Sequence, residues 1–251
     1  MIESFPRQML YPAPPVTVPS PPPAPLEEVR LDLASGDCAV AWVHVPPALP
    51  SDAPVVLFFH GNGENVETLR RSGLFEQLGG LGVAVVAPDF PGYGRSTGSP
   101  SEEGLIATGD ASLAWARQRY PERPLAVCGW SLGAALAIAT VDRHAGEVQG
   151  LVALSAWTTL AEVAVKLFPA FAVKLMLREH YDSQSAAPRI KVPSLVVHGK
   201  LDELIPVEQG REIASLLGGS KRYVEIPGAG HNDLLGYREV WEEIGRFLNA
   251  L

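Results

Sequence analysis

The sequence predicts an α/β fold, in which one domain is built around a mostly parallel β-sheet. Short runs of consecutive apolar residues, bounded by Gly, Pro or Asp, alternate with segments of helical length along most of the chain. Strands buried on both faces have this continuous apolar pattern, which is typical of parallel sheets. The 251 residues, 47% of them hydrophobic and 19% charged, fit one large domain with a substantial core.

The chain begins with a proline-rich arm, which we assign to residues 1–26. Nine prolines lie between Pro6 and Pro25. Because proline fixes φ and lacks an amide donor, this stretch should form neither a regular helix nor a central strand. We expect an extended arm and favour one that packs on the domain. The alternative is a docking ligand for a partner that reads proline-rich segments.

Two kinds of strand are expected after the arm. Apolar and polar residues alternate over 28–33 and 39–45, as in an antiparallel pair. The continuous apolar runs predict further strands at 55–59, 83–87, 125–128, 151–154, 195–197 and 223–226. Helices are expected at 67–78, 102–119, 131–145, 207–217 and 238–251. Their alternation with strands implies right-handed crossovers and an open sheet with helices on both faces.

Charge and cysteine content exclude several classes of function. The net charge of −8 argues against nucleic acid as a partner, because phosphate binding needs a basic face. Cys128 lies in an apolar run and is predicted to be a small buried thiol. No Cys/His spacing resembles a zinc site, and we expect neither metal nor cofactor. We find no signal-peptide pattern and no membrane span, so we expect a cytoplasmic protein without a stable membrane anchor.

The segment Gly129-Trp130-Ser131-Leu132-Gly133 has the pattern of a nucleophile elbow. It follows a predicted strand directly and opens an Ala-rich helical stretch. The glycines two residues before and after the serine avoid collisions at the tight turn. The helix N-terminus places unpaired amides beside the hydroxyl. We predict that Ser131 is a nucleophile.

A nucleophilic serine needs a base, because a free hydroxyl is almost never ionised at neutral pH. His231 lies in a glycine-rich loop between the last strand and the final helix, where parallel sheets build their sites. Asp202 lies in the loop after the preceding strand and is predicted to orient this histidine. The chain order Ser, Asp, His is the one the elbow fold requires. Glu203 is the nearest rival for the acid, and Asp233 is a poorer one.

An oxyanion formed during the reaction would need two backbone N–H donors. One is predicted at Leu132, directly after the nucleophile. The other is predicted at Asn62, in the loop after the strand at 55–59, with Gly61 and Gly63 shaping the turn.

Several segments together resemble the α/β-hydrolase superfamily, and within it the Bem46-like serine hydrolases. They are the run from His60 to Gly63, the run from Asp89 to Ser96, the elbow, the loop with Asp202, and Gly230-His231. The resemblance covers about residues 27–251 and implies an eight-stranded mostly parallel sheet and cofactor-independent hydrolysis of esters or thioesters. Depalmitoylases of this group carry N-terminal cysteines for membrane attachment. No cysteine precedes Cys38 here, so neither the attachment nor that substrate is carried over.

A large lid domain is not expected. Residues about 156–188 leave room only for a small helical lid segment, which we expect to shape an acyl-binding pocket. The predicted pocket residues are Trp157 and Phe168 of this segment, together with Gly61, Tyr93 and Trp130. Asp89 is predicted to organise a loop and to take no part in catalysis.

The sequence therefore predicts a serine hydrolase acting on a small-molecule or lipid-like ester or thioester. Two alternatives stay open. One is a peptidase or amidase that uses the same three residues. The other is a non-catalytic binding protein with a hydrolase fold. The oligomeric state is not predicted.

Overall fold

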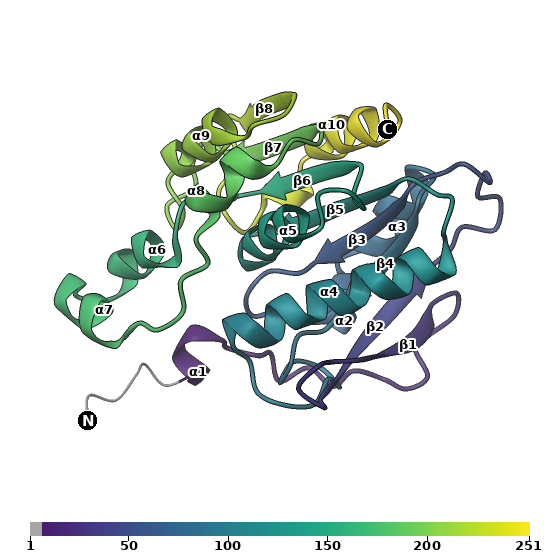
Figure 1. The fold of residues 1–251 in the computed structure, drawn as a ribbon, viewed down its shortest axis with the longest axis horizontal. Helices are drawn as coiled ribbons and strands as arrows, with labels where there is room; N and C mark the ends of the chain where they lie inside the picture. Colours follow the sequence, from purple (N-terminus) through teal and green to yellow (C-terminus); the bar gives the residue numbers. More distant parts are fainter. Residues whose placement is uncertain (1–6) are drawn as a thin grey trace.

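The computed structural model describes residues 7–251, which contain one eight-stranded sheet with the strand order β1-β2-β4-β3-β5-β6-β7-β8 (Figure 1). The strands are β1 (Glu27–Asp32), β2 (Cys38–His44), β3 (Val55–Phe59), β4 (Ala84–Pro88), β5 (Leu125–Trp130), β6 (Gly150–Leu154), β7 (Ser194–Gly199) and β8 (Lys221–Ile226). Only β1 with β2 and β2 with β4 pair antiparallel; the other pairs are parallel. The predicted mostly parallel sheet is confirmed.

Outside the lid segment and the arm, the α-helices lie within about three residues of the predicted segments, with one exception. They are α2 (Val66–Arg71), α3 (Leu74–Gly80), α4 (Glu102–Arg119), α5 (Leu132–Arg143), α9 (Val207–Leu216) and α10 (Arg238–Leu248). The single helix predicted over 67–78 is wrong: it is two helices, α2 and α3. Gly73 lies between them with a φ of 80°, a left-handed conformation that interrupts the helical backbone.

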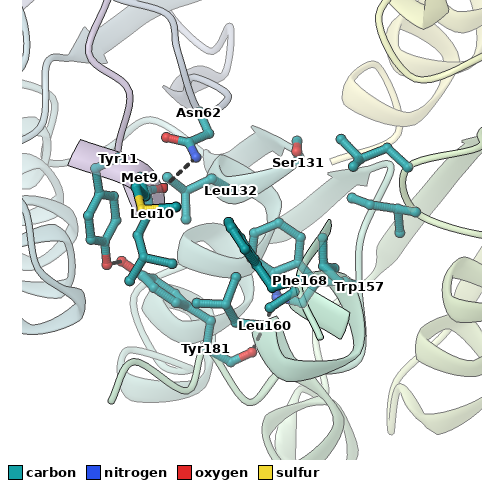
Figure 2. A pocket seen from close by; sticks show the side chains of 14 residues that line it. Met9, Leu10, Tyr11, Asn62, Ser131, Leu132, Trp157, Leu160, Phe168 and Tyr181 are labelled. Atoms are coloured by element: carbon teal, nitrogen blue, oxygen red, sulfur yellow. Dashed lines mark hydrogen bonds between the residues drawn. The ribbon is translucent and has the colours of Figure 1, made fainter. Parts of the chain in front are cut away.

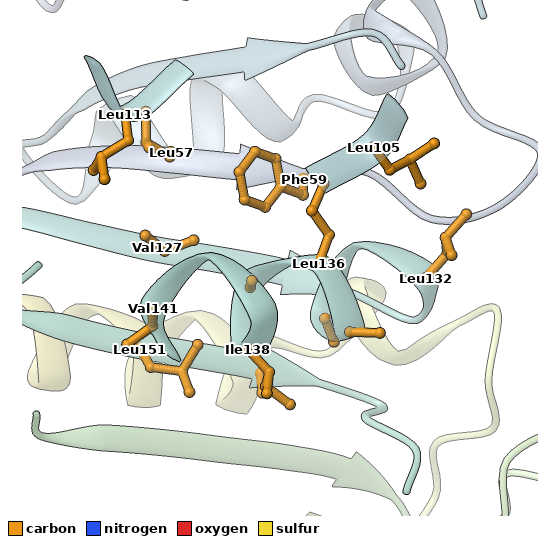
Figure 3. Close-up of a cluster of buried hydrophobic side chains, with 14 of the residues drawn as sticks. Leu57, Phe59, Leu105, Leu113, Val127, Leu132, Leu136, Ile138, Val141 and Leu151 are labelled. Atoms are coloured by element: carbon orange, nitrogen blue, oxygen red, sulfur yellow. The ribbon is translucent and has the colours of Figure 1, made fainter. Parts of the chain in front are cut away.

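Helices cover both faces of the sheet, and the side chains of β3 are therefore buried on both faces. Its side chains point alternately to opposite faces. Leu57 and Phe59 pack with α4 and α5 on one face, where they meet Leu105, Leu113 and Leu136 (Figure 3). The alternate residues of β3 join the apolar cluster formed with α2, α3 and α10 on the other face. The continuous apolar sequence of β3 is therefore a consequence of burial on both faces.

Strand β3 is also the point at which the chain changes direction across the sheet. From β3 the chain crosses to β4 on one side, and from β4 it returns past β3 to β5 on the other side. In open α/β sheets, a crevice forms outside the carboxyl ends of the strands at such a switch point. The loops that follow β3 and β5 should therefore build the site.

The arm packs on the domain along the residues that the structure describes. Tyr11 is 4% exposed and Val18 is 5% exposed, and the Asn65 side chain donates a hydrogen bond to the Val16 carbonyl. The prediction that the arm holds no helix is wrong at one point, because α1 (Arg7–Leu10) forms a single turn. This turn lies in the proline-free interval before Pro12. Residues 1–6 of the predicted arm lie outside the described residues.

The lid segment, residues 156–188, contains the short helices α6 (Leu160–Leu167), α7 (Ala170–Met176) and α8 (Ser183–Ala186). Helices α6 and α7 form a small apolar cluster of their own, against which Leu10 of the arm packs. Figure 1 shows α1, α6 and α7 gathered on the same side of the molecule. The arm and the lid segment, far apart in sequence, are thus neighbours.

Within residues 7–251, none of the helices combines the length and the apolar composition that crossing a bilayer requires. Cys128 is 1% exposed, so the predicted buried thiol is confirmed. Burial raises the pKa of this thiol and keeps it neutral.

Candidate active site

Ser131 occupies a sharp bend between β5 and α5. Its φ of 57° and ψ of −117° lie outside the ordinary regions for a residue with a side chain. The Ser131 amide donates to the Leu154 carbonyl of β6, which anchors the bend to the neighbouring strand. Helix α5 begins at the next residue, Leu132. The first amides of a helix have no intrahelical acceptor, so the Leu132 N–H is available beside the serine hydroxyl.

The two glycines of the elbow are required by close backbone contacts. A Cβ on Gly129 would lie 2.0 Å from the Gly133 carbonyl oxygen. A Cβ on Gly133 would lie 2.0 Å from the carbonyl oxygen of Phe59 in β3. Both distances are far below van der Waals contact, so a side chain at either position would push β5, α5 and β3 apart. The elbow is this tight because backbone meets backbone on both sides.

His231 lies between Ser131 and Asp202. Its Nε2 atom is 3.0 Å from Ser131 Oγ, and its Nδ1 atom is 2.7 Å from Asp202 Oδ2. Nδ1–H donates to the carboxylate, which leaves Nε2 as the acceptor for the serine hydroxyl proton. All three residues are buried, with 6%, 9% and 6% exposed for Ser131, His231 and Asp202. The structure brings the three predicted residues into one hydrogen-bonded chain.

The two rival acids lie elsewhere. Glu203 is exposed and Asp233 accepts a hydrogen bond from the Gly230 amide at 2.7 Å. Asp202 Oδ1 accepts from the Leu204 and Ile205 amides at 3.0 and 2.7 Å, which leaves Oδ2 for the histidine. The loop of Asp202 is also bound to that of His231, because the Leu201 amide donates to the Ala229 carbonyl.

A second histidine contacts Asp202. His198 Nε2 lies 2.9 Å from the Ile205 carbonyl oxygen and 3.4 Å from Asp202 Oδ2, and the ring is fully buried. Burial raises the pKa of Asp202, but hydrogen bonds from His198 and His231 outweigh it, and the pKa lies well below its usual value. The carboxylate is therefore ionised at neutral pH. This contact of His198 with Asp202 was not predicted from the sequence.

The loop after β3 places Asn62 beside the serine. The Asn62 side chain is held from two directions: it accepts from the Tyr93 hydroxyl at 2.6 Å and donates to the Leu10 carbonyl at 2.7 Å. Figure 2 shows the bond to Leu10. The neighbouring Gly61 amide is already used, because it donates to Glu64 Oε2 at 2.8 Å. Asn62 lines the cavity that contains Ser131, as does Leu132.

Three of the predicted pocket residues do not line this cavity, and we correct their assignment. Tyr93 is fully buried behind Asn62, whose side chain it holds. Trp130 lies against His231 with ring centroids 5.3 Å apart, on the side away from the cavity that contains Ser131. Gly61 admits the Trp130 ring, because a Cβ there would lie 2.6 Å from it. These residues position the site and do not form its wall.

Asp89 organises a loop, as predicted. It is fully buried, and its Oδ1 atom accepts a hydrogen bond from the Val66 amide at the start of α2. Burial raises the pKa of Asp89 to about 7. A Cβ on Gly94 would lie 1.8 Å from Asp89 Oδ2, so the turn that follows β4 closes directly over the carboxyl group.

A cavity of about 110 Å³ opens beside Ser131 (Figure 2). Trp157 and Phe168 of the lid segment line it, as predicted, together with Leu160 and Tyr181. The residues that line it carry no charged side chain in the part of the chain that the structure describes. A space of this kind suits a small apolar group.

The arm also lines the cavity, which the sequence analysis missed. Met9, Leu10 and Tyr11 form part of its wall. The signal available in the sequence was weak: these three residues lie between Pro6 and Pro12 and are too few to show a periodicity.

Comparison with known proteins agrees with this architecture. The chain belongs to the alpha/beta hydrolase fold family, whose sequence profile matches residues 54–180. It is 33% identical over 225 residues to the uncharacterized protein Rv2307c of Mycobacterium tuberculosis, covering 88% of this chain and 78% of that protein. It is 27% identical over 225 residues to the protein bem46 of Schizosaccharomyces pombe, covering 86% and 75%. The predicted resemblance to Bem46-like proteins is confirmed.

Among solved structures, the esterase Pf2001 of Pyrococcus furiosus superposes with a TM-score of 0.75. The superposition covers 95% of this chain and 98% of the esterase, at 21% sequence identity. This likeness shows a shared fold.

Proposed function

We propose that this protein is a serine hydrolase that cleaves carboxylic ester or thioester bonds through an acyl-enzyme on Ser131. The observation that carries the proposal is the hydrogen-bonded chain from Ser131 Oγ through the His231 ring to Asp202 Oδ2, with distances of 3.0 and 2.7 Å. This arrangement is the one by which a histidine removes the proton of an attacking serine.

In the first step, Ser131 Oγ forms a bond to the substrate carbonyl carbon while its proton passes to His231 Nε2. The negative charge that develops on the carbonyl oxygen accepts hydrogen bonds from the Leu132 and Asn62 amides. Asp202 stabilises the imidazolium and holds its orientation. The tetrahedral intermediate then expels the alcohol or thiol, which receives the proton from His231.

In the second step, water replaces the leaving group. His231 removes a proton from the water as its oxygen attacks the acyl carbon. Collapse of the second tetrahedral intermediate releases the carboxylic acid and returns the proton to Ser131 Oγ. The backbone donors act in both steps, and removing one such donor typically costs about 100- to 1000-fold in rate.

Two further observations support an ester of an uncharged acyl group as the substrate. The cavity beside Ser131 is lined by uncharged residues, including Leu132 and Trp157. A similarly folded protein, Pf2001, is described as an esterase. We therefore propose a small-molecule or lipid-like ester or thioester as the substrate, with no nucleic acid and no cofactor involved.

A fluorophosphonate probe tests the nucleophile. We expect it to label the wild-type protein and to fail with Ser131→Ala. Ser215→Ala is the matched control, since this serine on α9 is exposed and its hydroxyl donates to the Glu212 carbonyl of the same helix. Labelling that survives Ser131→Ala would contradict the assignment. A folded wild-type protein that takes no probe would point to a binding protein without turnover.

A substrate panel tests the class of bond. We expect p-nitrophenyl esters and thioesters to be hydrolysed far faster than aminoacyl anilides, because alcohol and thiol leaving groups require less protonation than an amine. Faster cleavage of the anilides would replace the proposed activity with that of a peptidase or amidase.

A further inference from the structure

We infer that Leu10 and Tyr11 of the arm determine substrate specificity, because they form part of the wall of the cavity beside Ser131 and restrict the acyl group to a short chain. The chain length is on the order of four carbons for a cavity smaller than one that accepts benzene. This inference rests on the proposed function and names the substrate class of the same site. It assigns to the arm a direct role at the site, where the family profile matches only residues 54–180.

The size of the cavity limits the length of the acyl group. Its volume is about 110 Å³. A cavity that accepts benzene has about 150 Å³. A butanoyl group fits the smaller space, whereas an octanoyl or longer chain would need the wall to move.

The arm and the lid segment together form much of the wall of this cavity. Trp157 and Phe168 of the lid segment line one part of the wall and Leu10 and Tyr11 of the arm another. Tyr181 joins the two, because its hydroxyl contacts that of Tyr11 (Figure 2). Leu10 also packs on the apolar cluster of α6 and α7. The arm therefore fills the space through which a longer acyl chain would have to extend.

Hydrogen bonds hold this part of the wall in place. The Tyr11 and Tyr181 hydroxyls are 2.8 Å apart and buried. The Tyr181 carbonyl accepts from Trp157 Nε1 at 3.3 Å, and the Tyr181 amide donates to Glu102 Oε1 at 2.8 Å. Tyr181 is thus held by α4 and by the lid segment, and it holds the arm in turn.

The same stretch of the arm also contacts Asn62, which lies beside the serine. The Leu10 carbonyl accepts a hydrogen bond from Asn62 Nδ2 at 2.7 Å. Asn62 is the proposed oxyanion donor of the loop after β3. A long acyl chain that displaced Leu10 would therefore also break the hydrogen bond that holds the Asn62 side chain. The length of the acyl chain thus affects the rate of acylation through Leu10.

The test is kcat/KM for p-nitrophenyl esters from acetate to dodecanoate, measured on the full-length protein. We expect the wild-type optimum at butanoate. Leu10→Ala should raise hexanoate relative to butanoate by about tenfold, the effect expected when two more methylenes are buried. Leu10→Phe should shift the optimum to acetate. Tyr11→Phe keeps the ring but removes the hydroxyl bond, and should broaden the profile.

Val18→Ala is the matched control, because Val18 is a buried residue of the arm that packs in the cluster on the other face of the sheet. It should leave the profile unchanged. A wild-type optimum at octanoate or longer, or an unchanged profile in both Leu10 variants, overturns the inference. Fluorophosphonate labelling separates the two failures: a labelled protein with such a profile keeps the proposed function, whereas a folded protein without labelling loses both.

Discussion

The elbow and the acyl cavity lie side by side but are built in different ways. At the elbow, backbone meets backbone: Gly129 and Gly133 each leave no room for a single carbon. Much of the cavity wall consists of side chains from two separate segments, the arm and the lid segment, and Leu10 of the arm packs against the small apolar cluster of α6 and α7. The groups that we propose to react are thus fixed by the packed sheet, while the proposed space for the substrate depends on a few replaceable side chains.

This difference separates the residues that set rate from those that set specificity. Changes at the elbow or in the chain from Ser131 to Asp202 should affect all substrates alike. Changes in the arm should redistribute activity among substrates.

Asp202→Asn should have the largest effect. Asparagine keeps the shape of the side chain but cannot hold His231 in the tautomer that accepts the serine proton, which costs on the order of 10⁴-fold in kcat in a comparable triad. Steady-state kinetics with p-nitrophenyl butanoate measure this loss.

Glu203→Gln is the control for this variant, because Glu203 is the adjacent acid and is exposed. It should leave kcat near the wild-type value. If Glu203→Gln were the more damaging of the two, the acid assignment would be wrong.

Gly133→Ala should come next. The added Cβ would lie 2.0 Å from the Phe59 carbonyl, so α5 must shift and carry the Leu132 amide away from the oxyanion. We expect a loss of at least about 100-fold in kcat/KM, similar for every ester, since misplacement by about 1 Å has such a cost. A change in chain-length preference without loss of rate would contradict the comparison.

Gly146→Ala is the control for the elbow variant. Gly146 follows α5, and a Cβ there would meet nothing within 4 Å. Activity and melting temperature should stay close to those of the wild-type protein.

Glu64→Gln should have the smallest effect and should act on stability. Burial raises the pKa of Glu64 from 4.5 to about 7, although the Gly61 amide donates to it. Between these two pH values the folded protein keeps a proton that the unfolded chain has released. The free energy of unfolding therefore falls as pH rises through this window and stays lower above it.

Glutamine accepts the same Gly61 hydrogen bond but does not titrate. We expect Glu64→Gln to lose about 1–3 kcal/mol less than the wild-type protein between pH 5 and pH 8, from the size of the pKa shift. Denaturant unfolding at both pH values measures the difference. Equal losses in the variant and the wild-type protein would show that Glu64 ionises freely.

The sheet and the elbow could be predicted from sequence because their signals are local. The apolar runs mark strands buried on both faces, and the glycines flanking Ser131 follow from the sharpness of a strand-to-helix turn. Asp202 and His231 follow from chain order, since loops after neighbouring parallel strands open at the same end of the sheet.

The cavity wall could not be predicted in this way. Tyr11 and Tyr181 are 170 residues apart, and nothing in a proline-rich segment fixes where it will lie. Tyr93 and Trp130 were assigned to the pocket because they lie in or next to motif residues. Adjacent residues in a turn, however, direct their side chains to different sides. The contact of His198 with Asp202 depends on how the loop after β7 folds back on the strand.

Mass spectrometry of an acylated intermediate tests the central claim most directly. After brief reaction with p-nitrophenyl butanoate, quenched in acid to stop the second step by unfolding the protein, we predict a butanoyl group on the peptide that contains Ser131. His231→Asn and Ser131→Ala should show no such adduct. Full turnover by Ser131→Ala, or an adduct on any other residue that forms at the rate of turnover, would contradict the account.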